Sequence, residues 1–165
     1  MEKPITLKFK YTEKEYVEAV KWYYSKLSNV KLDVIISIVL IVLSGSLWVT
    51  GGKETYFAGI FLLGCIMLLI IIFALYINPK RNFKQELKFH DEYNLSITDE
   101  GISFQTVNIS SMIAWNHYSK VKENNNFFYL IYGKYMFTII PKRTFINKNE
   151  EELFRKLVEE KLDIK

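Results

Sequence analysis

The stretch TYFAGIFLLGCIMLLIIIFALYI (residues 55–77) contains no charged side chain. A helix rises about 1.5 Å per residue, so a helix over this stretch reaches about 34 Å. The hydrocarbon core of a lipid bilayer is about 30 Å thick. The stretch therefore predicts a helix that spans a membrane.

A second uncharged run, residues 34–50, precedes the first after a short polar turn. As a helix it reaches only about 26 Å, which is at the short end for a membrane span. It becomes long enough if Leu32 is included and Asp33 lies at the membrane surface. We therefore expect two neighbouring spans, at about 32–50 and 55–77.

A buried helical hairpin in a soluble protein is the alternative for these two runs. A chain of 165 residues leaves too little polar sequence to cover two such helices, so we favour the membrane. A signal peptide is excluded for the first run, because polar sequence precedes it and the usual layout of a signal peptide is missing.

Charge asymmetry predicts the orientation of the hairpin. Basic residues flank its two outer ends, whereas the turn offers only Lys53 beside Glu54. Because positive residues stay on the cytoplasmic side, we expect a multi-pass protein of the bacterial cytoplasmic membrane with both termini in the cytoplasm. The flanking basic residues are Lys21, Lys26, Lys31, Lys80, Arg81, Lys84 and Lys88.

The net charge of +4 and the pI near 9.0 have two explanations. A nucleic-acid partner is one, but the sequence has no recognition helix or basic arm, so none is expected. The membrane is the other. Lys80, Arg81, Lys84 and Lys88 either fix the topology alone or also contact anionic lipid, at up to about 1 kcal/mol each.

The turn at residues 51–54 begins with two glycines, which permit a tight reversal. Folding the chain there brings Gly45 and Ser46 level with Gly59 and Ile60. Small residues at equal depth let two helices approach closely in lipid. The sequence has no GxxxG motif, so it does not signal self-association of the hairpin.

The N-terminal arm predicts a strand followed by a helix. Residues 5–11 (ITLKFKY) alternate apolar and polar, and we expect them to pair with the sheet that begins near Tyr93. Thr12 and Glu15 have the spacing of a capping box, so a helix should begin near Glu13 and run into the first span, either continuously or with a break near residues 28–29. Its aromatic residues fit either a membrane-surface belt or packing against the cytoplasmic domain.

Short alternating segments separated by turn residues follow the hairpin and predict an antiparallel meander. Together with the N-terminal segment, they give about seven strands. An amphipathic helix capped at Asn147 should close the sheet. The six later strands are expected at 93–98, 102–107, 111–115, 120–123, 127–132 and 135–140, and the apolar stripe of the helix consists of Leu153, Phe154, Leu157, Val158 and Leu162.

The last strand leaves two choices for its buried face. The period of two places Phe137 and Ile139 on one face, and Met136, Thr138 and Ile140 on the other. Aromatic size favours the first set, which we expect to lie under the C-terminal helix.

The stretch FTIIPKRTF (residues 137–145) ends this strand at Pro141, which has no N–H for a sheet ladder. Lys142 and Arg143 follow. They are expected to form a solvated loop or, as the alternative, to contact anionic headgroups or a partner.

The spacing of the C-terminal third resembles the YcxB-like family of small bacterial membrane proteins. The segments WNHYSKVKE, FYLIY and FTIIPKRTF carry the resemblance, and the two adjacent spans extend it to most of the chain. The matching residues are Trp115, Tyr118, Val121, Phe128, Leu130, Phe137, Ile140, Pro141, Lys142, Arg143 and Phe145.

The resemblance implies an integral membrane protein whose cytoplasmic domain is a PH- or GRAM-like antiparallel β-barrel closed by a C-terminal helix. It implies no established activity. Related bacterial membrane proteins of the PH type can accompany peptide toxins as immunity factors.

The sequence offers no catalytic motif. His90 and His117 stand without other ligands at metal-binding spacing, and Cys65 is the only cysteine. We therefore expect no enzyme activity, no metal and no cofactor.

The expected organisation is α+β. Residues 1–31 form a cytoplasmic strand and helix that pack with the C-terminal domain, residues 32–78 form the hairpin, and residues 79–165 form the PH-like domain. The expected function is a membrane-anchored, non-enzymatic binding or scaffold protein. The alternative is an immunity factor against a membrane-active peptide or toxin.

Overall fold

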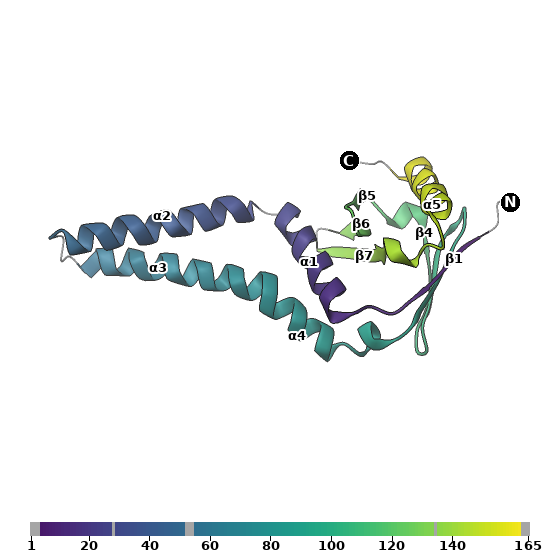
Figure 1. The fold of residues 1–165 in the computed structure, drawn as a ribbon, viewed down its shortest axis with the longest axis horizontal. Helices are drawn as coiled ribbons and strands as arrows, with labels where there is room; N and C mark the ends of the chain where they lie inside the picture. Colours follow the sequence, from purple (N-terminus) through teal and green to yellow (C-terminus); the bar gives the residue numbers. More distant parts are fainter. Residues whose placement is uncertain (1–3, 28, 52–54, 134, 163–165) are drawn as a thin grey trace. The chain divides into compact units, whose positions relative to one another are not determined.

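The computed structural model describes residues 4–27, 29–51, 55–133 and 135–162. The chain divides into two compact units (Figure 1). Unit 2, Thr12–Glu86, contains only helices among its described residues. Unit 1 combines Met1–Tyr11 with Leu87–Lys165 and contains the strands.

Helix α1 (Glu13–Leu27) begins at the predicted capping box. The Glu15 N–H donates to the Thr12 Oγ1 at 3.2 Å, and the Thr12 N–H donates to the Glu15 Oε2 at 3.1 Å. These two bonds satisfy backbone donors that a helix start leaves unpaired. Helix α2 (Val30–Val49) follows after Asn29, which confirms the alternative with a break.

The predicted reversal at 51–54 falls largely on residues 52–54, which lie outside the described residues. Helix α3 (Thr55–Ile72) continues through a π-helical turn (Phe73–Ile77) into α4 (Asn78–Gln85). Pro79 lies in the first turn of α4. The wider π turn lies in the preceding residues, where the proline ring would meet a carbonyl oxygen.

Helices α2 and α3 pack side by side as a hairpin (Figure 1). Their close approach is at Gly64, where an added Cβ would lie 3.0 Å from the Ser37 carbonyl oxygen. The prediction that Gly59 makes a close approach is wrong, because a Cβ at Gly59 would meet nothing within 4 Å. At Gly45 the neighbour is the Phe61 ring, at 3.7 Å, so an aromatic side chain fills this level.

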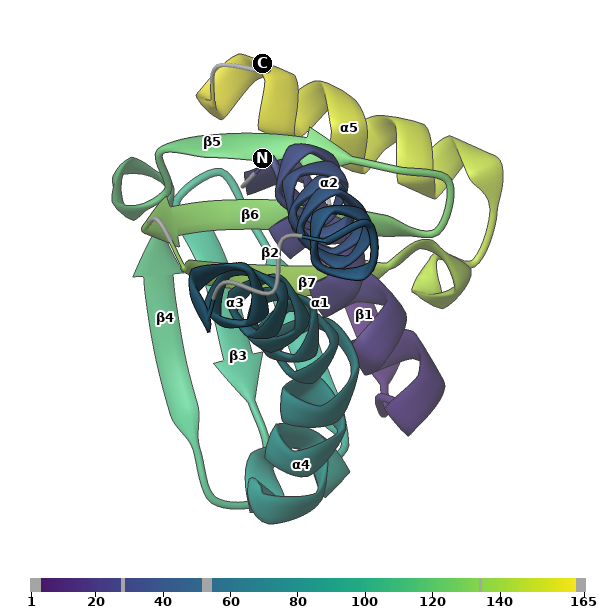
Figure 2. The ribbon, with the colours of Figure 1, turned by 90° about the vertical axis from the view of Figure 1, so that its left-hand side faces the viewer.

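All seven predicted strands are present, in two antiparallel sheets (Figures 1 and 2). The four-stranded sheet has the order β1-β2-β3-β4, and the three-stranded sheet has the order β5-β6-β7. The strands are β1 (Ile5–Phe9), β2 (Tyr93–Ile97), β3 (Gly101–Gln105), β4 (Ser110–Ala114), β5 (Lys120–Glu123), β6 (Phe127–Gly133) and β7 (Met136–Pro141).

The predicted closed barrel is wrong, because the two sheets share no ladder in the part of the chain that the structure describes. Between β4 and β5 the chain forms a short 3-10 helix (Trp115–His117). The buried Trp115 indole donates to the Thr98 carbonyl oxygen at 2.8 Å, which fixes this turn away from β4. The chain therefore changes sheets here, and β4 remains an edge.

Strand β1 pairs with β2 from Ile5↔Ile97 to Phe9↔Tyr93. This register confirms that the N-terminal segment joins the sheet that follows the hairpin. The inward residues of β1 include Leu7, which is 0% exposed. The N-terminus therefore supplies part of the core of unit 1.

Helix α5 (Lys148–Lys161) begins as predicted, with the Asn147 side chain accepting a hydrogen bond from the Glu150 N–H at 2.9 Å. Phe154 and Val158 are buried on its inner face. Leu153, which was expected on the same stripe, is 51% exposed.

The face of β7 toward α5 differs from the prediction. Ile140 pairs with Phe128 of β6, whose ring centroid lies 5.0 Å from that of Phe154. Phe137 lies on the opposite face near Tyr129, at 6.1 Å between ring centroids. Both faces of the neighbouring strand β6 are buried, so apolar residues occur on both faces of this sheet. The period of two therefore does not show which face of β7 lies toward α5.

Candidate functional site

The predicted basic segment is divided between the two units. Lys80, Arg81 and Lys84 are exposed on α4 of unit 2, whereas Lys88 lies in a 3-10 helix (Leu87–His90) of unit 1. The Lys84 Nζ is 4.0 Å from the Glu13 Oε2, which is a weak surface pair.

A shallow groove of about 590 Å³ lies within unit 2, along α1, the π turn and α4. The Lys21 Nζ donates to the Tyr76 hydroxyl at 2.6 Å and lies 4.1 Å from the centre of its ring. The groove therefore presents cations and carboxylates beside an aromatic ring at the end of the apolar helix. Its lining residues are Glu13, Lys14, Val17, Glu18, Lys21, Tyr76 and Lys80.

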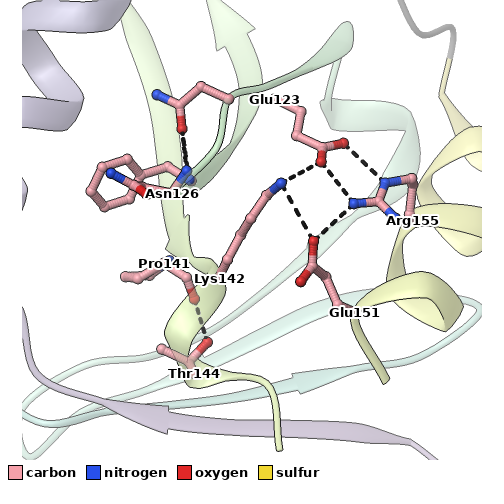
Figure 3. A network of polar contacts seen from close by, with 9 residues as sticks. Glu123, Asn126, Pro141, Lys142, Thr144, Glu151 and Arg155 are labelled. Carbon is pink, nitrogen blue, oxygen red and sulfur yellow. Dashed lines mark hydrogen bonds and ion pairs between the residues drawn. The ribbon is translucent and has the colours of Figure 1, made fainter. Parts of the chain in front are cut away.

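Lys142 lies in a network of ion pairs inside unit 1 (Figure 3). Its Nζ contacts the Glu123 carboxylate and lies 3.4 Å from the Glu151 Oε1. It also lies 4.9 Å above the Phe128 ring. The side chain is only 15% exposed, so the prediction of a solvated Lys142 is wrong. The strand that ends at Pro141 directs it toward two carboxylates.

Arg155 completes the network (Figure 3). Its Nη2 lies 2.8 Å from the Glu123 Oε1 and 2.8 Å from the Glu151 Oε1, and its Nε donates to the Glu123 Oε2 at 3.1 Å. Two cations thus face two carboxylates. The network ties β5 to the end of β7 and to α5.

The pKa shifts show that the network favours its charged form. The pKa of Glu123 is lowered chiefly by the hydrogen bond from Arg155, against the effect of burial, with Lys142 adding to the lowering. The pKa of Arg155 is raised chiefly by its hydrogen bond to Glu123. A network that stays ionised near neutral pH is suited to holding elements together and unsuited to proton transfer.

Arg143 has a different position from Lys142. Its side chain is exposed, and its Nη2 donates to the Lys10 carbonyl oxygen at 2.9 Å. Arg143 therefore ties the end of β7 to the chain that leaves β1.

The other residues of the predicted family signature contribute mainly to the core. Trp115, Tyr118, Pro141 and Phe145 are buried, and Phe137 is half-buried.

The Tyr118 hydroxyl has no hydrogen-bond partner of good geometry among the described residues. Burial strongly raises its pKa, and the nearby Thr138 side chain opposes this shift. A neutral, buried phenol in this position acts as a packing group.

Sequence reasoning missed Glu123, Glu151 and Arg155. Glu151 and Arg155 had a local signal, because they are four residues apart on one helix. Glu123 had none, since it reaches the network from another strand. Within the described ranges, no group of three or more His, Cys, Asp or Glu side chains is placed to hold a metal ion.

One comparison with known protein families gives a match. The family model described as YcxB-like protein matches residues 97–158. These residues form a YcxB-like domain. The YcxB-like domain runs from the end of β2 into α5 and contains the whole ion-pair network, which confirms the resemblance over this range. No curated protein and no solved structure matches the chain.

Proposed function

We propose that the protein is a membrane-anchored, non-enzymatic binding protein that presents its YcxB-like domain as a PH-like domain at the inner face of the bacterial cytoplasmic membrane. The apolar surface of the hairpin carries this proposal. In the most apolar 18-residue segment of α2, only 11% is buried within the chain. In the corresponding segment of the continuous helix Thr55–Gln85, only 6% is buried. Contact of so much apolar surface with water is unfavourable, and lipid removes that contact.

The pairing of β1 with β2 supports a common side for the two ends of the hairpin. These strands flank the hairpin in sequence and form one ladder. Under the proposal, the chain therefore returns to the side from which it entered. The basic residues at the outer ends, including the exposed Lys80 and Arg81, favour the cytoplasm as that side.

The exposed cations of α4 support an anionic ligand at the leaflet surface. Lys80, Arg81 and Lys84 follow the apolar helix directly, and each adds up to about 1 kcal/mol of attraction to an anionic leaflet. Lys88 is an exposed cation of the other unit, and we propose the same contact with anionic lipid for it. Lys142 already contacts two carboxylates, so the proposed lipid contact does not include it.

The two-sheet arrangement supports the PH-like assignment. A four-stranded and a three-stranded antiparallel sheet, followed by one C-terminal helix, form unit 1. Seven strands and a closing helix are what the resemblance to PH-type domains implies.

Cysteine labelling tests the membrane topology. Gly52→Cys and Asn125→Cys are made separately with Cys65→Ser, and intact cells are treated with an impermeant thiol reagent. Labelling at position 52 is expected in intact cells, and labelling at position 125 is expected only after permeabilisation. The reverse pattern contradicts the orientation, and release of the protein by alkaline carbonate contradicts the membrane anchor.

Retained lipid tests the anionic contact. The Lys80→Gln and Arg81→Gln double variant should co-purify with less anionic phospholipid than the wild type, measured by native mass spectrometry. Lys148→Gln with Lys156→Gln removes the same charge from exposed positions of α5 and serves as the control. If both double variants lost the same amount of bound anionic phospholipid, the effect would be one of overall charge, and this would contradict a specific contact at Lys80 and Arg81.

A further inference from the structure

Among the described residues, the open sheets leave four edge strands, β1, β4, β5 and β7. Exposed edges invite pairing with another chain, and proteins usually block them with charges or proline. Three of these edges carry such a block. Strand β1 contains Lys8, β5 contains Lys120 and Lys122, and β7 ends at Pro141. Strand β4 contains neither a charge nor a proline.

The absence of charge extends well beyond β4. No Asp, Glu, Lys or Arg occurs from Gly101 to Ser119, although these residues make up 24% of the chain. The other edge strands of the same domain contain or adjoin a charged residue or a proline, whereas this exposed hairpin has no charged residue over its whole length. It removes the usual electrostatic barrier to pairing.

The backbone of β4 offers free ladder positions. The Thr106 N–H bonds to the Ile109 carbonyl oxygen at 2.8 Å, and the Trp115 N–H bonds to the Glu100 carbonyl oxygen at 3.4 Å. Bonded pairs alternate along an antiparallel ladder, so intervening residues of β4 direct their N–H and C=O groups away from β3. In the described part of the chain these outward groups meet no strand. They belong to Ser110, Met112 and Ala114.

Several apolar side chains around this edge are exposed. Met112 is 57% exposed, Ile109 is 47% exposed, and Val107 in the adjoining turn is 83% exposed. In Figure 2, β4 forms an outer edge of its sheet. An unpaired ladder beside exposed apolar side chains fits an added strand, because the backbone groups and the apolar surface are then covered together.

We propose that β4 pairs antiparallel with β4 of a second copy of this chain, about a two-fold axis at Met112. In a two-fold contact the strand pairs with its own sequence, so a charge at position 112 would face its own copy, and like charges at positions 110 and 114 would face one another. The absence of charge from residues 101–119 meets this condition. A different partner would not require it, since a charge could then face an opposite charge. The pairing joins two four-stranded sheets into one, and it does not depend on the membrane proposal.

The register follows from the free ladder positions. With Met112 opposite Met112, Ser110 lies opposite Ala114, and every outward N–H and C=O group of β4 finds a partner. Bonded pairs have Cα atoms about 5.5 Å apart, within the usual range for a disulfide. The two copies of Ile109 are then about 20 Å apart, from about 3.4 Å per residue, and the two copies of Val107, in the turn beyond, are farther apart still.

Disulfide formation tests this register in the full chain. Met112→Cys and Val107→Cys are made separately with Cys65→Ser, and native membranes are oxidised with copper phenanthroline. Met112→Cys should give a disulfide dimer at least tenfold faster than the more exposed Val107→Cys. Equal rates for the two variants, or no dimer for either, would overturn the proposal. Membrane retention is measured on the same samples and reports on the anchor separately.

A second experiment tests the occupant of the edge. A photo-crosslinking residue at position 112 should give mainly a dimer of this chain, and a crosslink mainly to another protein or to lipid would overturn the proposal. Met112→Lys should lower the dimer fraction measured by mass photometry in detergent, whereas Val107→Lys should leave it unchanged. Both side chains are exposed, and protease resistance checks that both variants remain folded.

Discussion

Lys142 shares two carboxylates with Arg155, above the ring of Phe128. With Lys142 removed, Glu123 and Glu151 would share a single cation. The loss of one partner from a partly buried network leaves the opposite charge under-compensated, and this costs more than the loss of an exposed pair.

Lys142→Gln is therefore expected to lower the free energy of unfolding by about 1–3 kcal/mol. Arg143→Gln, which removes one exposed hydrogen bond to the Lys10 carbonyl oxygen, should cost less than about 1 kcal/mol. Denaturant unfolding of the purified protein in detergent measures both values. Equal costs would contradict the role assigned to Lys142.

The pH dependence of Glu123 follows from its lowered pKa. A carboxylate with a lowered pKa in the folded state adds stability above its unfolded pKa, about 4.3 for Glu, and this stability is lost as the pH falls through the folded pKa. Glu123→Gln should therefore reduce stability at pH 7 and flatten the loss of stability below about pH 5.

Glu152→Gln is the control for this pH experiment, because Glu152 is an exposed glutamate outside the network. Thermal unfolding between pH 3 and pH 7 gives the two profiles. A Glu123→Gln profile that parallels the wild type across this range would show that the network does not titrate as described.

At the scale of elements, one glycine fixes how closely the helices of the hairpin approach. A Cβ at Gly64 would lie 2.8 Å from the Ile41 Cγ1 and 3.0 Å from the Ser37 carbonyl oxygen. The backbone contact cannot adjust by a rotamer change. Since close packing of small residues drives helix association in lipid, a larger side chain here separates α2 from α3.

Gly64→Leu should therefore lower the midpoint of thermal unfolding in detergent by several degrees. Gly59→Leu places the same side chain on the same helix, where a Cβ meets nothing within 4 Å, and should leave the midpoint nearly unchanged. A larger decrease for Gly59→Leu would contradict the packing of this hairpin.

The sequence predicted elements better than it predicted their contacts. Strands, turns and caps depend on neighbouring residues, and all seven strands and the Asn147 cap follow the local pattern. The facing side of β7 does not, because β6 is buried on both faces. The contact between Lys142 and Glu123 joins positions 19 residues apart, and no local pattern pairs them.

At the scale of the whole molecule, unit 1 is interrupted in sequence by unit 2. The match to the YcxB-like family begins at residue 97 and does not include β1. The core of unit 1 nevertheless includes Leu7, which is 0% exposed and lies opposite Leu95. The period-two pattern of residues 5–11 made this contribution predictable from the sequence. No comparable pattern in the sequence indicates that the strands form two open sheets.

Leu7→Ala should lower the free energy of unfolding of unit 1 by about 2–5 kcal/mol, the usual cost of such a truncation in a core. Thr6→Ala changes an exposed neighbour on the same strand and should cost less than about 1 kcal/mol. Protease digestion of native membranes, followed with an antibody to the C-terminus, measures how often the strands after the hairpin open. Equal digestion rates would exclude β1 from the core.

The ladder between β1 and β2 also orders events during synthesis. About 80 residues separate the two strands, so at about 5–20 residues per second β1 waits roughly 4–16 s on the ribosome for its partner. Under the proposed topology, both spans must be inserted in that interval. A chain that inserted only one span would leave the two strands on opposite sides of the bilayer, and the four-stranded sheet could not form. Under that topology, completion of this sheet would be a checkpoint for correct insertion, and a nascent chain that failed it would expose an unfolded domain to the proteases of the cell.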